Sequence, residues 1–454
     1  MLNSGIPGLT WPPIPGRMDA WILALLDQFH EARNWPLDRL RDHQFKQLAP
    51  LLRHHARTSP FFTERYGAWV RETGGKLTPE SFKKLPLLTR ADIQNAGESL
   101  FSTEVPTDHG LIWGRGTSGS TGEPVTIRVT NLSEAFRFAL SLRFEAWNNR
   151  DRDGIYALIR AIEDSEQGLP PEGDSEPNWR PFPGNRTRLL NCGSCSLDQQ
   201  LDWLAEMKVN YLTTYPSNLE YLARRSEERN FELPCLRDMS TMSEGLSLGQ
   251  RTLIERAFGA PVIETYGSEE VGFTAFQCPQ PGHHHLLVQM ESVIWEILNE
   301  NGEECAPGEV GRVVVTDLHN FASPLIRYEQ GDLAEWDAPC AGEFTRPAIR
   351  RVMGRVRHMM QLPGGAMTFP FRWEEETGKI APSVRQLQII QRSLSEMDVV
   401  LAVQEPLVEE EEKAILGTIA KRLDHKFQLT PVYVDKIPRA KSGKFEEFVC
   451  AVEG

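Results

Sequence analysis

The residues of this chain best suited to chemistry begin with a polar stretch at 113–126. Four glycines and five Ser or Thr residues fall within its fourteen positions. Glycine has no Cβ, so the backbone N–H groups of such a loop can turn inward beside the hydroxyl donors. A concavity of this kind binds an anion, usually phosphate. The alternative is an ordinary polar surface loop, because Gly/Ser/Thr clusters commonly form one.

The end of this stretch argues against one large class of phosphate-binding enzymes. A nucleotide triphosphatase loop carries a lysine directly after its last glycine. Here Gly122 is followed by Glu123 and Pro124. The sequence therefore disfavours a kinase or GTPase of that type, and the cation that neutralises a bound phosphate must come from another part of the chain.

A second candidate, residues 264–272, follows a predicted strand and reads Glu-Thr-Tyr-Gly-Ser-Glu-Glu-Val-Gly. The ring of Tyr266, at the end of that strand, can lie beside a planar base. The adjacent carboxylates of Glu269 and Glu270 can hold Mg²⁺, which prefers oxygen ligands and bound phosphates. The alternative is a plain strand-to-loop turn whose acidic side chains are solvated.

Residues 316–332 contain a third candidate. The segment 324–328, Pro-Leu-Ile-Arg-Tyr, is predicted to be a strand that carries Arg327. Asp332 lies in the turn after Gly331, and its carboxylate can accept hydrogen bonds from a ribose diol. The competing interpretation is a structural ion pair between an arginine and an aspartate of this segment.

The fourth candidate is a basic loop near the end of the sequence, residues 436–444. It carries Arg439, Lys441 and Lys444, with bends predicted at Pro438 and Gly443. A mobile loop of this kind can deliver a lysine to a developing oxyanion. For any one of these basic residues, a solvated position on the surface is the alternative.

Cysteine and histidine residues raise the question of zinc. A structural site needs four converging ligands, and the linear spacing of the candidates matches no tight zinc motif. The pair Cys192 and Cys195 is an isolated C-x-x-C and is weak evidence on its own. The sequence leaves zinc open for the following residues: Cys278, His283, His284, His285, Cys305 and Cys340.

The elements that must position these groups alternate along most of the chain. Strand-like apolar runs are expected at 111–113, 154–158, 209–213 and 261–265, and amphipathic helices at 133–147, 197–207, 218–229 and 248–258. Such alternation favours α/β layers with parallel sheets. The stretch before it, 18–70, is predicted to be helical from the spacing of its apolar residues.

After residue 354 the pattern changes to that of a small α+β unit. Strands are expected at 386–391, 398–403 and 431–435. A helix is expected at 409–427, where the acidic start suits the positive end of the helix dipole. The sequence thus predicts a large N-terminal domain over 1–354 and a small C-terminal domain over 355–454.

The overall composition is that of an ordinary soluble enzyme. The chain has 454 residues, of which 40% are hydrophobic and 25% charged, and it is too long for one compact core. Its net charge of −14 argues against nucleic acid as a partner. No membrane span or signal peptide is expected, and seven scattered cysteines favour a reduced, cytoplasmic setting.

The four motifs, in this order, resemble the adenylate-forming ligase superfamily and, within it, the phenylacetate–CoA ligase-like branch. The resemblance extends over nearly the whole chain. It is carried by the stretches at 66–67, 82–90, 117–124, 243–246, 266–271, 324–332, 353–355 and 437–444.

This resemblance implies a reaction and a division of labour between the domains. ATP, with Mg²⁺, would activate a small carboxylic acid to an acyl-adenylate, releasing pyrophosphate. The acyl group would then pass to a thiol such as CoA, or to an amine. Residues 1–354 would form the adenylation domain, and residues 355–454 a mobile lid. An aryl or arylacetic acid is the expected substrate, and a homodimer is compatible with this family.

Each motif also acquires a role by the same resemblance. The triphosphate would lie against Thr117, Ser118, Gly119, Ser120, Thr121 and Gly122. The adenosine would lie against Ser243, Glu244, Gly245, Glu264, Thr265, Tyr266, Gly267, Ser268, Asp332 and Arg355. The acid would lie against Tyr215, Pro216, Tyr266, Gly267 and Phe273, with Phe136, Phe138 and Trp147 as further candidate walls. Glu270 would bind Mg²⁺, and Lys444 would act in catalysis with Thr117 and Glu270.

Glu269 departs from the family pattern, which usually has Thr or Ser at this position to contact the α-phosphate or the acid. A second carboxylate would repel both anions unless it faces Mg²⁺ or solvent. Three other interpretations stay open. They are an adenylating amide or carrier-protein ligase that does not use CoA, a phosphate-releasing nucleotidase or kinase, and a catalytically silent nucleotide-binding module.

Overall fold

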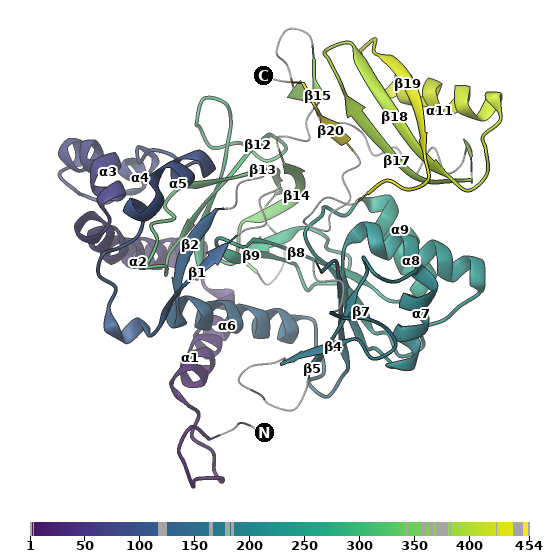
Figure 1. Ribbon diagram of the computed structural model, residues 1–454. Helices are drawn as coiled ribbons and strands as arrows, with labels where there is room; N and C mark the ends of the chain where they lie inside the picture. The colour runs from purple at the N-terminus through teal and green to yellow at the C-terminus, as the bar shows by residue number, and fades with distance from the viewer. Residues whose placement is uncertain are drawn as a thin grey trace. The chain divides into compact units, whose positions relative to one another are not determined.

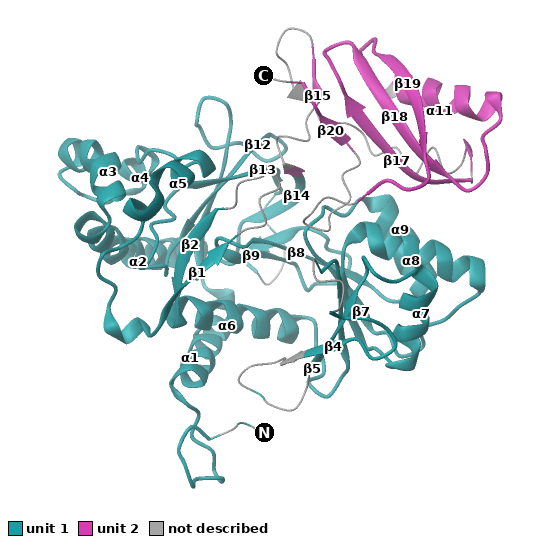
Figure 2. Cartoon of the chain, viewed as in Figure 1, with its two compact units in different colours: residues 1–353 teal, residues 354–454 magenta. Residues whose placement is uncertain are grey.

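The computed structural model describes residues 2, 4–116, 125–162, 167–177, 182, 186–338, 340, 344–355, 360–362, 367–368, 380–381, 383–423, 425–438 and 448–452. The chain divides into two compact units, residues 1–353 and residues 354–454 (Figure 2). Each unit has its own hydrophobic core, so each is described by itself.

A twelve-stranded mixed sheet organises the first unit (Figure 1), in the order β11-β12-β13-β14-β10-β9-β8-β7-β6-β3-β5-β4. Its parallel part consists of β5 (Arg186–Asn191), β3 (Tyr156–Arg160), β6 (Tyr211–Thr214), β7 (Asp238–Thr241) and β8 (Val262–Ser268). The connecting helices are α7 (Leu197–Glu206), α8 (Pro216–Arg229) and α9 (Leu248–Phe258). Their apolar faces pack on these strands through leucines such as Leu204, Leu219 and Leu222. The predicted α/β class with parallel sheet is confirmed.

The antiparallel part of the sheet carries most of the remaining motifs. It consists of β9 (Gly272–Gln277), β10 (Leu286–Val288), β11 (Val293–Leu298), β12 (Val310–Asp317), β13 (Tyr328–Trp336) and β14 (Ala348–Arg355), with the short β4 (Asp174–Pro177) at the far edge. The segment predicted as a strand at 324–328 is mostly not one, because β13 begins only at Tyr328. Arg327 has a φ of 49°, a left-handed conformation that a strand cannot contain.

Helices fill the N-terminal part of the first unit, as predicted. They are α1 (Arg17–Glu31), α2 (Leu37–Thr58), α3 (Pro60–Thr73), α4 (Pro79–Lys83) and α5 (Arg90–Ala96), with short 3₁₀ turns at Ala32–Asn34, Gly97–Leu100 and Thr107–His109. α1 packs along α6 (Asn131–Trp147) through apolar residues that include Ile22 and Ala139. A separate two-stranded sheet, β1 (Ile112–Gly116) and β2 (Thr126–Thr130), precedes α6.

The second unit contains a four-stranded sheet in the order β19-β18-β17-β20. Its elements are β17 (Val384–Gln391), β18 (Glu396–Val403), α11 (Glu409–Arg422), β19 (Gln428–Val434) and β20 (Phe448–Cys450), and a small hairpin of β15 (Met360–Gln361) and β16 (Met367–Thr368) precedes them. α11 packs on the sheet through Ile415 and Ile419. The helix predicted at 409–427 ends at Arg422, because the chain must turn to pair β19 in parallel with β18.

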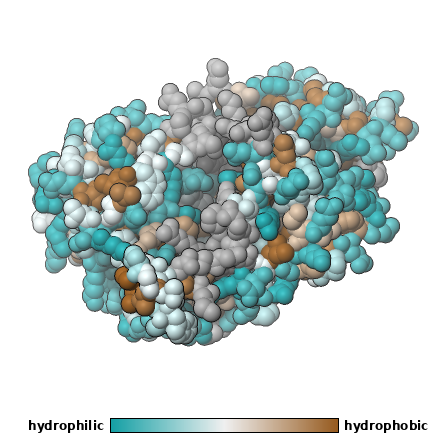
Figure 3. Space-filling view, turned by 60° about the horizontal axis from the view of Figure 1, so that its bottom comes forward, coloured by the Kyte–Doolittle hydropathy of each residue, from teal (hydrophilic) through white to brown (hydrophobic). Residues whose placement is uncertain are grey.

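The surface of the chain is polar with scattered apolar residues. Hydrophilic side chains predominate on the face drawn in Figure 3, and hydrophobic ones occur there in small separate groups. Among the described residues, the most exposed large hydrophobic side chains are those of Trp11, Leu111 and Leu248, which belong to different parts of the chain. No helix in the described ranges is both long enough and apolar enough to cross a bilayer.

Candidate active site

The hairpin between β8 and β9 carries the second sequence motif, and a glycine shapes it. The pairing of the two strands shifts register between Tyr266 and Gly267. A Cβ added to Gly267 would lie 2.4 Å from the carbonyl oxygen of Gly272, so only glycine fits this close approach of the two backbones. In the turn that follows, the Val271 N–H donates to Ser268 Oγ at 3.3 Å. The hairpin thereby holds Tyr266 on one strand and Glu270 in the turn.

Tyr266 contacts Asp332, a residue of the third motif. The Tyr266 hydroxyl donates to Asp332 Oδ2 at 2.7 Å. The Tyr266 ring also packs edge-on against Trp295, with 5.3 Å between ring centroids and 79° between the ring planes. Asp332 follows Gly331, whose φ of 80° requires a residue without a side chain. The residues predicted to meet the base and the ribose of a nucleotide are therefore adjacent.

Glu270 is a buried carboxylate with two partners among the described residues. Its side chain is 6% exposed. The hydroxyl of Tyr328, the first residue of β13, donates to Glu270 Oε1 at 3.2 Å. Arg90 Nη1 lies 3.6 Å from the same oxygen. Both contacts recorded within the described residues therefore fall on Oε1.

Arg90 reaches Glu270 because the preceding residues attach to β13. The Leu88 N–H donates to the Arg327 carbonyl oxygen at 2.9 Å, and the Glu329 N–H donates to the Leu88 carbonyl oxygen at 2.8 Å. Thr89 then caps α5, with its hydroxyl accepting from the Asp92 N–H at 3.1 Å. Arg90 is thus the first residue of a capped helix. Local sequence could identify that cap, but it could not identify the approach of this helix to Glu270.

Arg327 makes a buried ion pair with Glu296, so the alternative of an Arg327–Asp332 pair is wrong. Its guanidinium donates to both Glu296 carboxylate oxygens, at 3.0 and 2.8 Å. It also donates to the carbonyl oxygens of Lys83 and Leu85, each at 2.6 Å. Arg327 therefore fastens the α4 segment to β11 and plays a structural part.

The segment 243–245, between β7 and α9, contacts the first turn of α8 through Glu244. The Glu244 carboxylate accepts from the Ser217 N–H at 3.1 Å and from the Ser217 hydroxyl at 3.2 Å. A carboxylate at a helix N-terminus is favourable because it satisfies free N–H groups and meets the positive end of the dipole. Ser243 has a φ of 66°, which is uncommon for a residue with a side chain and is typical of functional turns. This contact brings Ser243, Glu244 and Gly245 next to Pro216 and Ser217.

Glu264 and Thr265, on β8, are engaged with neighbouring elements. The Glu264 carboxylate pairs with Arg251 of α9 at 2.6 Å. The backbone N–H of Glu264 donates to Gln277 Oε1 at 3.1 Å. The Thr265 hydroxyl donates to the Thr241 carbonyl oxygen at 3.4 Å, which ties β8 to β7. The carboxylate predicted to meet the adenine amino group is therefore held in place by an arginine.

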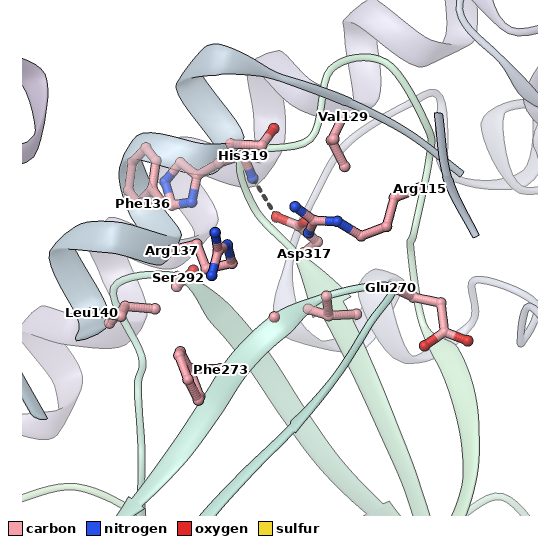
Figure 4. A pocket seen from close by; sticks show the side chains of 13 residues that line it. Arg115, Val129, Phe136, Arg137, Leu140, Glu270, Phe273, Ser292, Asp317 and His319 are labelled. Atoms are coloured by element: carbon pink, nitrogen blue, oxygen red, sulfur yellow. Dashed lines mark hydrogen bonds between the residues drawn. The ribbon is translucent and has the colours of Figure 1, made fainter. Parts of the chain in front are cut away.

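A pocket opens between α6 and the β8–β9 turn (Figure 4). Its lining consists of Arg115, Val129, Ser133, Phe136, Arg137, Leu140, Glu270, Val271, Gly272, Phe273, Ser292, Asp317 and His319. In Figure 4 Phe136 and His319 lie against each other on one side of the pocket, and Glu270 lies across from them. The rings of Phe136 and His319 stack with 3.6 Å between their centroids. The pocket thus combines an apolar wall with a row of polar groups and borders the Glu270 carboxylate.

Ion pairs and burial set the charge states of the polar groups in this pocket. Arg115 and Arg137 both pair with the carboxylate of Glu134. Burial raises the pKa of Asp317 to about 6, and it lowers the pKa of His319 to about 3. A neutral imidazole next to two guanidinium groups presents hydrogen-bonding atoms without adding further charge.

The structure places some of the predicted acid-binding residues at this pocket and others away from it. Phe136 and Phe273 line the pocket, whereas Tyr215 and Pro216 are not among its lining residues. Tyr215 is 3% exposed and its phenol oxygen accepts from the Ala161 N–H at 3.3 Å. Trp147 packs on Phe276 and Phe344. Because base rates favour the core for such aromatic residues, Tyr215 and Trp147 fit a structural part better than a wall of this pocket.

Some predicted residues lie outside the described part of the chain. Thr117, Ser118, Gly119, Ser120, Thr121, Gly122 and Lys444 belong to this group, and of Arg355 only the backbone is described. The ends of the first stretch are described. β1 and β2 pair antiparallel, with Gly116 opposite Thr126.

The set of residues that the structure gathers here is larger than the set that the sequence singled out. Arg90, Arg115, Arg137, Tyr328 and His319 all border Glu270 or the pocket. None of them stands out by spacing, because each comes from a different element. Arg115, two residues before Thr117 within the first stretch, had one available signal, namely a cation on the strand that leads into a predicted phosphate loop.

Glu270 fits a Mg²⁺ ion of the kind that binds together with nucleotide phosphates. Such an ion uses one or two carboxylates and takes its other ligands from phosphates and water. Among the described residues, both contacts of the Glu270 carboxylate fall on Oε1, so Oε2 is the atom that would bind the ion. Glu269 is exposed, so its carboxylate faces solvent and does not add a second charge to the buried site.

Comparison with proteins of known identity gives matches over most of the chain. A family model described as the CapK C-terminal domain matches residues 374–450. The chain is 23% identical over 375 residues to a phenylacetate-coenzyme A ligase of Pseudomonas putida, which covers 79% of both proteins. It is 20% identical over 383 residues to Protein CapK of Staphylococcus aureus, covering 82% of this chain and 81% of that protein.

Solved structures share the same fold. A crystal structure of 2-hydroxyisobutyryl-CoA ligase in the postadenylation state, in complex with 2-HIB-AMP, superposes with a TM-score of 0.73 at 16% identity. The match covers 92% of this chain and 91% of that chain. At such low identity the similarity shows the fold alone, and it extends over both units of the chain.

Proposed function

We propose that this chain, a member of the adenylate-forming ligase superfamily by its fold and by its similarity to phenylacetate–CoA ligases, uses ATP to convert a carboxylic acid to an acyl-adenylate and then to a thioester. The observation that carries the proposal is the convergence of Tyr266, Asp332 and Glu270. Tyr266 and Asp332 are hydrogen-bonded at 2.7 Å, and Glu270 lies in the turn that follows Tyr266. A base, a ribose and a phosphate-bound cation occur in this order along a nucleotide.

The nucleoside would be held by groups that the protein has already fixed. The Tyr266 ring is immobilised by Trp295 and by the bond to Asp332, so little side-chain entropy is lost when a base packs on it. Asp332 Oδ2 accepts from Tyr266, and its carboxylate can accept further hydrogen bonds from the ribose diol, for which Arg355 is the second predicted contact. Ser243, Glu244 and Gly245 would border the adenine by their backbone, since the Glu244 carboxylate binds Ser217.

The reaction joins two anions, a carboxylate and a phosphate, so the site must offset their repulsion. Mg²⁺ bound by Glu270 would neutralise phosphate charge. The chain itself supplies Arg115 and Arg137 beside the pocket, and Lys444 is the predicted cation of the C-terminal unit. The hydroxyls and N–H groups of 117–122 are the predicted donors to the triphosphate. Arg90, 3.6 Å from Glu270, would orient this carboxylate.

The apolar lining of the pocket beside Glu270 supports an aryl or arylacetic acid as the substrate, although the pocket holds only about 20 Å³ of free space in this structure and must widen to admit a ring. Phe136, Leu140 and Phe273 offer apolar surface on which a flat ring can pack. Two named relatives act on aromatic acids by their printed names. One is the phenylacetate-coenzyme A ligase, and the other is an anthranilate CoA ligase in complex with anthranoyl-AMP, with a TM-score of 0.52 over 73% of this chain and 64% of that chain. Residues 1–354 would act as the adenylation domain and 355–454 as the lid.

CoA is the proposed acceptor because the named ligases are CoA ligases. A test can separate this proposal from an amide or carrier-protein ligase and from a silent homologue. Purified protein is given ATP, Mg²⁺ and a panel of aryl, arylacetic and aliphatic acids, with and without CoA. Pyrophosphate and AMP released only with an aryl acid, and a thioester formed only with CoA, are the expected results. Release of phosphate and ADP, or of nothing from any acid, refutes the proposal.

A further inference from the structure

Four of the six Cys and His residues that the sequence left open for zinc converge in the first unit. They are Cys278, His283, His285 and Cys340, and their ligand atoms all lie within 4.8 Å of one another. Cys278 follows the end of β9, His283 and His285 precede β10, and Cys340 lies between β13 and β14. The β9–β10 connection and the segment between β13 and β14 therefore supply one cluster.

The distances within this cluster are close to those of a tetrahedral zinc site. Cys278 Sγ lies 4.0 Å from Cys340 Sγ, and Cys340 Sγ lies 3.8 Å from His283 Nδ1. A zinc ion with Zn–S of about 2.3 Å and Zn–N of about 2.0 Å separates its ligand atoms by roughly 3.4–3.8 Å. These two separations exceed the values for a zinc site by a few tenths of an ångström, and no pair in the cluster is more than 4.8 Å apart, so side-chain rotations of about 1 Å or less bring the four atoms to zinc distances. A disulfide would require the two sulfur atoms to approach to about 2.05 Å.

His285 provides an independent sign that a ligand belongs here. Its Nε2 is buried and has no hydrogen-bond partner among the described residues. Its Nδ1 lies 3.6 Å from the carboxylate of Asp337. A buried polar nitrogen without a partner is costly. A carboxylate that faces one ring nitrogen, while the other points to a metal, is the usual arrangement behind a histidine ligand.

We propose that Cys278, His283, His285 and Cys340 bind one structural zinc ion. Two thiolates with two imidazoles in a tetrahedral arrangement are typical of Zn²⁺. Four protein ligands leave no open position, so the ion is structural and takes no part in the reaction. It cross-links the β9–β10 connection to the segment before β14. At its other end β9 begins directly after the turn that holds Glu270, so the zinc stabilises the strand behind the nucleotide site.

The two residues that remain from the original six provide controls, because the structure places them elsewhere. Cys305 is buried in another cluster, where its N–H donates to the Ile297 carbonyl oxygen at 2.8 Å. His284 is not part of this cluster and lines a hollow together with Arg251 and Glu255. His284 and His285 are adjacent in sequence, so the proposal predicts opposite effects on zinc binding for substitutions of two neighbouring histidines.

The first experiment measures metal content. Full-length protein purified without chelator from zinc-supplemented medium is expected to contain one zinc per chain by plasma mass spectrometry. His285→Asn and Cys340→Ser are expected to lose at least ~90% of it, whereas His284→Asn and Cys305→Ser keep it. A chain with less than ~0.1 zinc, or equal zinc in His284→Asn and His285→Asn, overturns the proposal.

The second experiment needs no variant and so does not depend on how the variants fold. X-ray absorption at the zinc edge of the wild-type protein is expected to show two sulfur and two nitrogen ligands, at about 2.3 and about 2.0 Å. Removal of the ion by a chelator should lower the melting temperature, and added Zn²⁺ should restore it, because the metal cross-links the β9–β10 connection to the segment before β14. A shell of nitrogen and oxygen only, or an unchanged melting temperature after complete removal, contradicts the proposal.

Discussion

The hydroxyl of Tyr266 donates to Asp332 Oδ2 at 2.7 Å, although β8 and β13, which carry the two residues, are separated in the sheet order by β9, β10 and β14. In a flat sheet, four strand spacings would amount to about 19 Å. The sheet must therefore curve strongly between β8 and β13. This curvature allows residues from two distant motifs to form one face of the proposed nucleotide site.

The first prediction concerns this hydrogen bond. Tyr266→Phe keeps the ring for packing on a base and removes only the donor to Asp332. A hydrogen bond to a charged group contributes about 1.5–3 kcal/mol, and part of it is regained when ATP occupies the site. We therefore expect KM for ATP to rise by roughly 3–10-fold with a nearly unchanged KM for the acid, measured by carboxylate-dependent pyrophosphate exchange.

The control for this variant is Tyr433→Phe, which removes another tyrosine–carboxylate hydrogen bond, to Glu412, on the surface of the second unit. It is expected to leave both KM values within about twofold, since exposed pairs contribute little. A similar rise of KM for ATP in both variants would show that loss of any such bond, rather than the site contact, causes the effect.

The second prediction concerns Glu270. Glu270→Gln keeps the shape of the side chain and the bond from Tyr328, but it removes the charge that Mg²⁺ requires and leaves Arg90 without its carboxylate partner. Pyrophosphate exchange is expected to fall by at least ~10²-fold, about 2.7 kcal/mol of barrier. The concentration of Mg²⁺ that gives half-maximal rate should rise as well.

Glu300→Gln serves as the matched control, because this carboxylate is exposed in the turn after β11. Its exchange rate should equal that of the wild type. If Glu270→Gln retains full exchange at low Mg²⁺, the assignment of this residue to the metal is wrong.

The sequence predicts those parts of this site that depend on local sequence patterns, and it does not predict those that depend on contacts between distant segments. The alternation of apolar strands and amphipathic helices predicts the layers, and the β8 motif identifies Tyr266 and Glu270 as candidates. The approach of Arg90 to Glu270 is not predictable in this way, because it depends on Leu88 joining β13. Long-range contacts of this kind leave no periodic pattern in the sequence.

The cluster of Cys278, His283, His285 and Cys340 shows the same limit. Cys340 is 62 residues from Cys278, so no compact motif is visible, and the six candidates of the sequence include two that the structure places elsewhere. Arg327 illustrates the opposite error. An apolar run with β-branched and aromatic residues predicts a strand, but the buried pair with Glu296 and a left-handed φ make this residue the end of a loop.

The third prediction tests the acid pocket. Phe273→Ala removes apolar surface that faces the pocket between α6 and the β8–β9 turn. Loss of one aromatic contact costs about 1.5–3 kcal/mol, so KM for an aryl acid should rise by roughly 10–100-fold. KM for ATP should remain the same, since Phe273 is not expected to touch the nucleotide. Because Phe273 also packs on Phe276, a melting curve must accompany the kinetics. An unchanged KM for the acid in a folded variant excludes this pocket.

The fourth prediction concerns the pH dependence of stability through Asp317. Burial raises the pKa of this carboxyl from 3.8 to about 6 in the folded chain. The native state therefore holds the proton more tightly than the unfolded state, and this group makes the chain less stable as the pH rises from about 4 to about 6. Above pH 6 the cost reaches at most about 3 kcal/mol.

Asp317→Asn removes this cost while its side-chain oxygen can still accept from the His319 N–H. The variant is expected to melt at a higher temperature than the wild type at pH 7.5, and at nearly the same temperature at pH 4. The measured quantity is the difference between the two proteins at each pH, because other titrating groups cancel in it. A difference that stays constant from pH 4 to 7.5 is inconsistent with the raised pKa.

The last prediction concerns Lys444, which lies outside the described residues. Its proposed task is to bring a positive charge to the phosphate at which the acid attacks, and a neutral side chain cannot offset the charge that grows there. Lys444→Ala should lower the adenylation rate by at least ~10²-fold, about 2.7 kcal/mol of barrier. Lys421→Ala, an exposed lysine of α11, is the control and should retain full activity. Because thioester formation from a preformed acyl-adenylate does not need this charge, the second half-reaction of Lys444→Ala should proceed at a nearly normal rate. Equal loss in both half-reactions would instead indicate a damaged C-terminal unit.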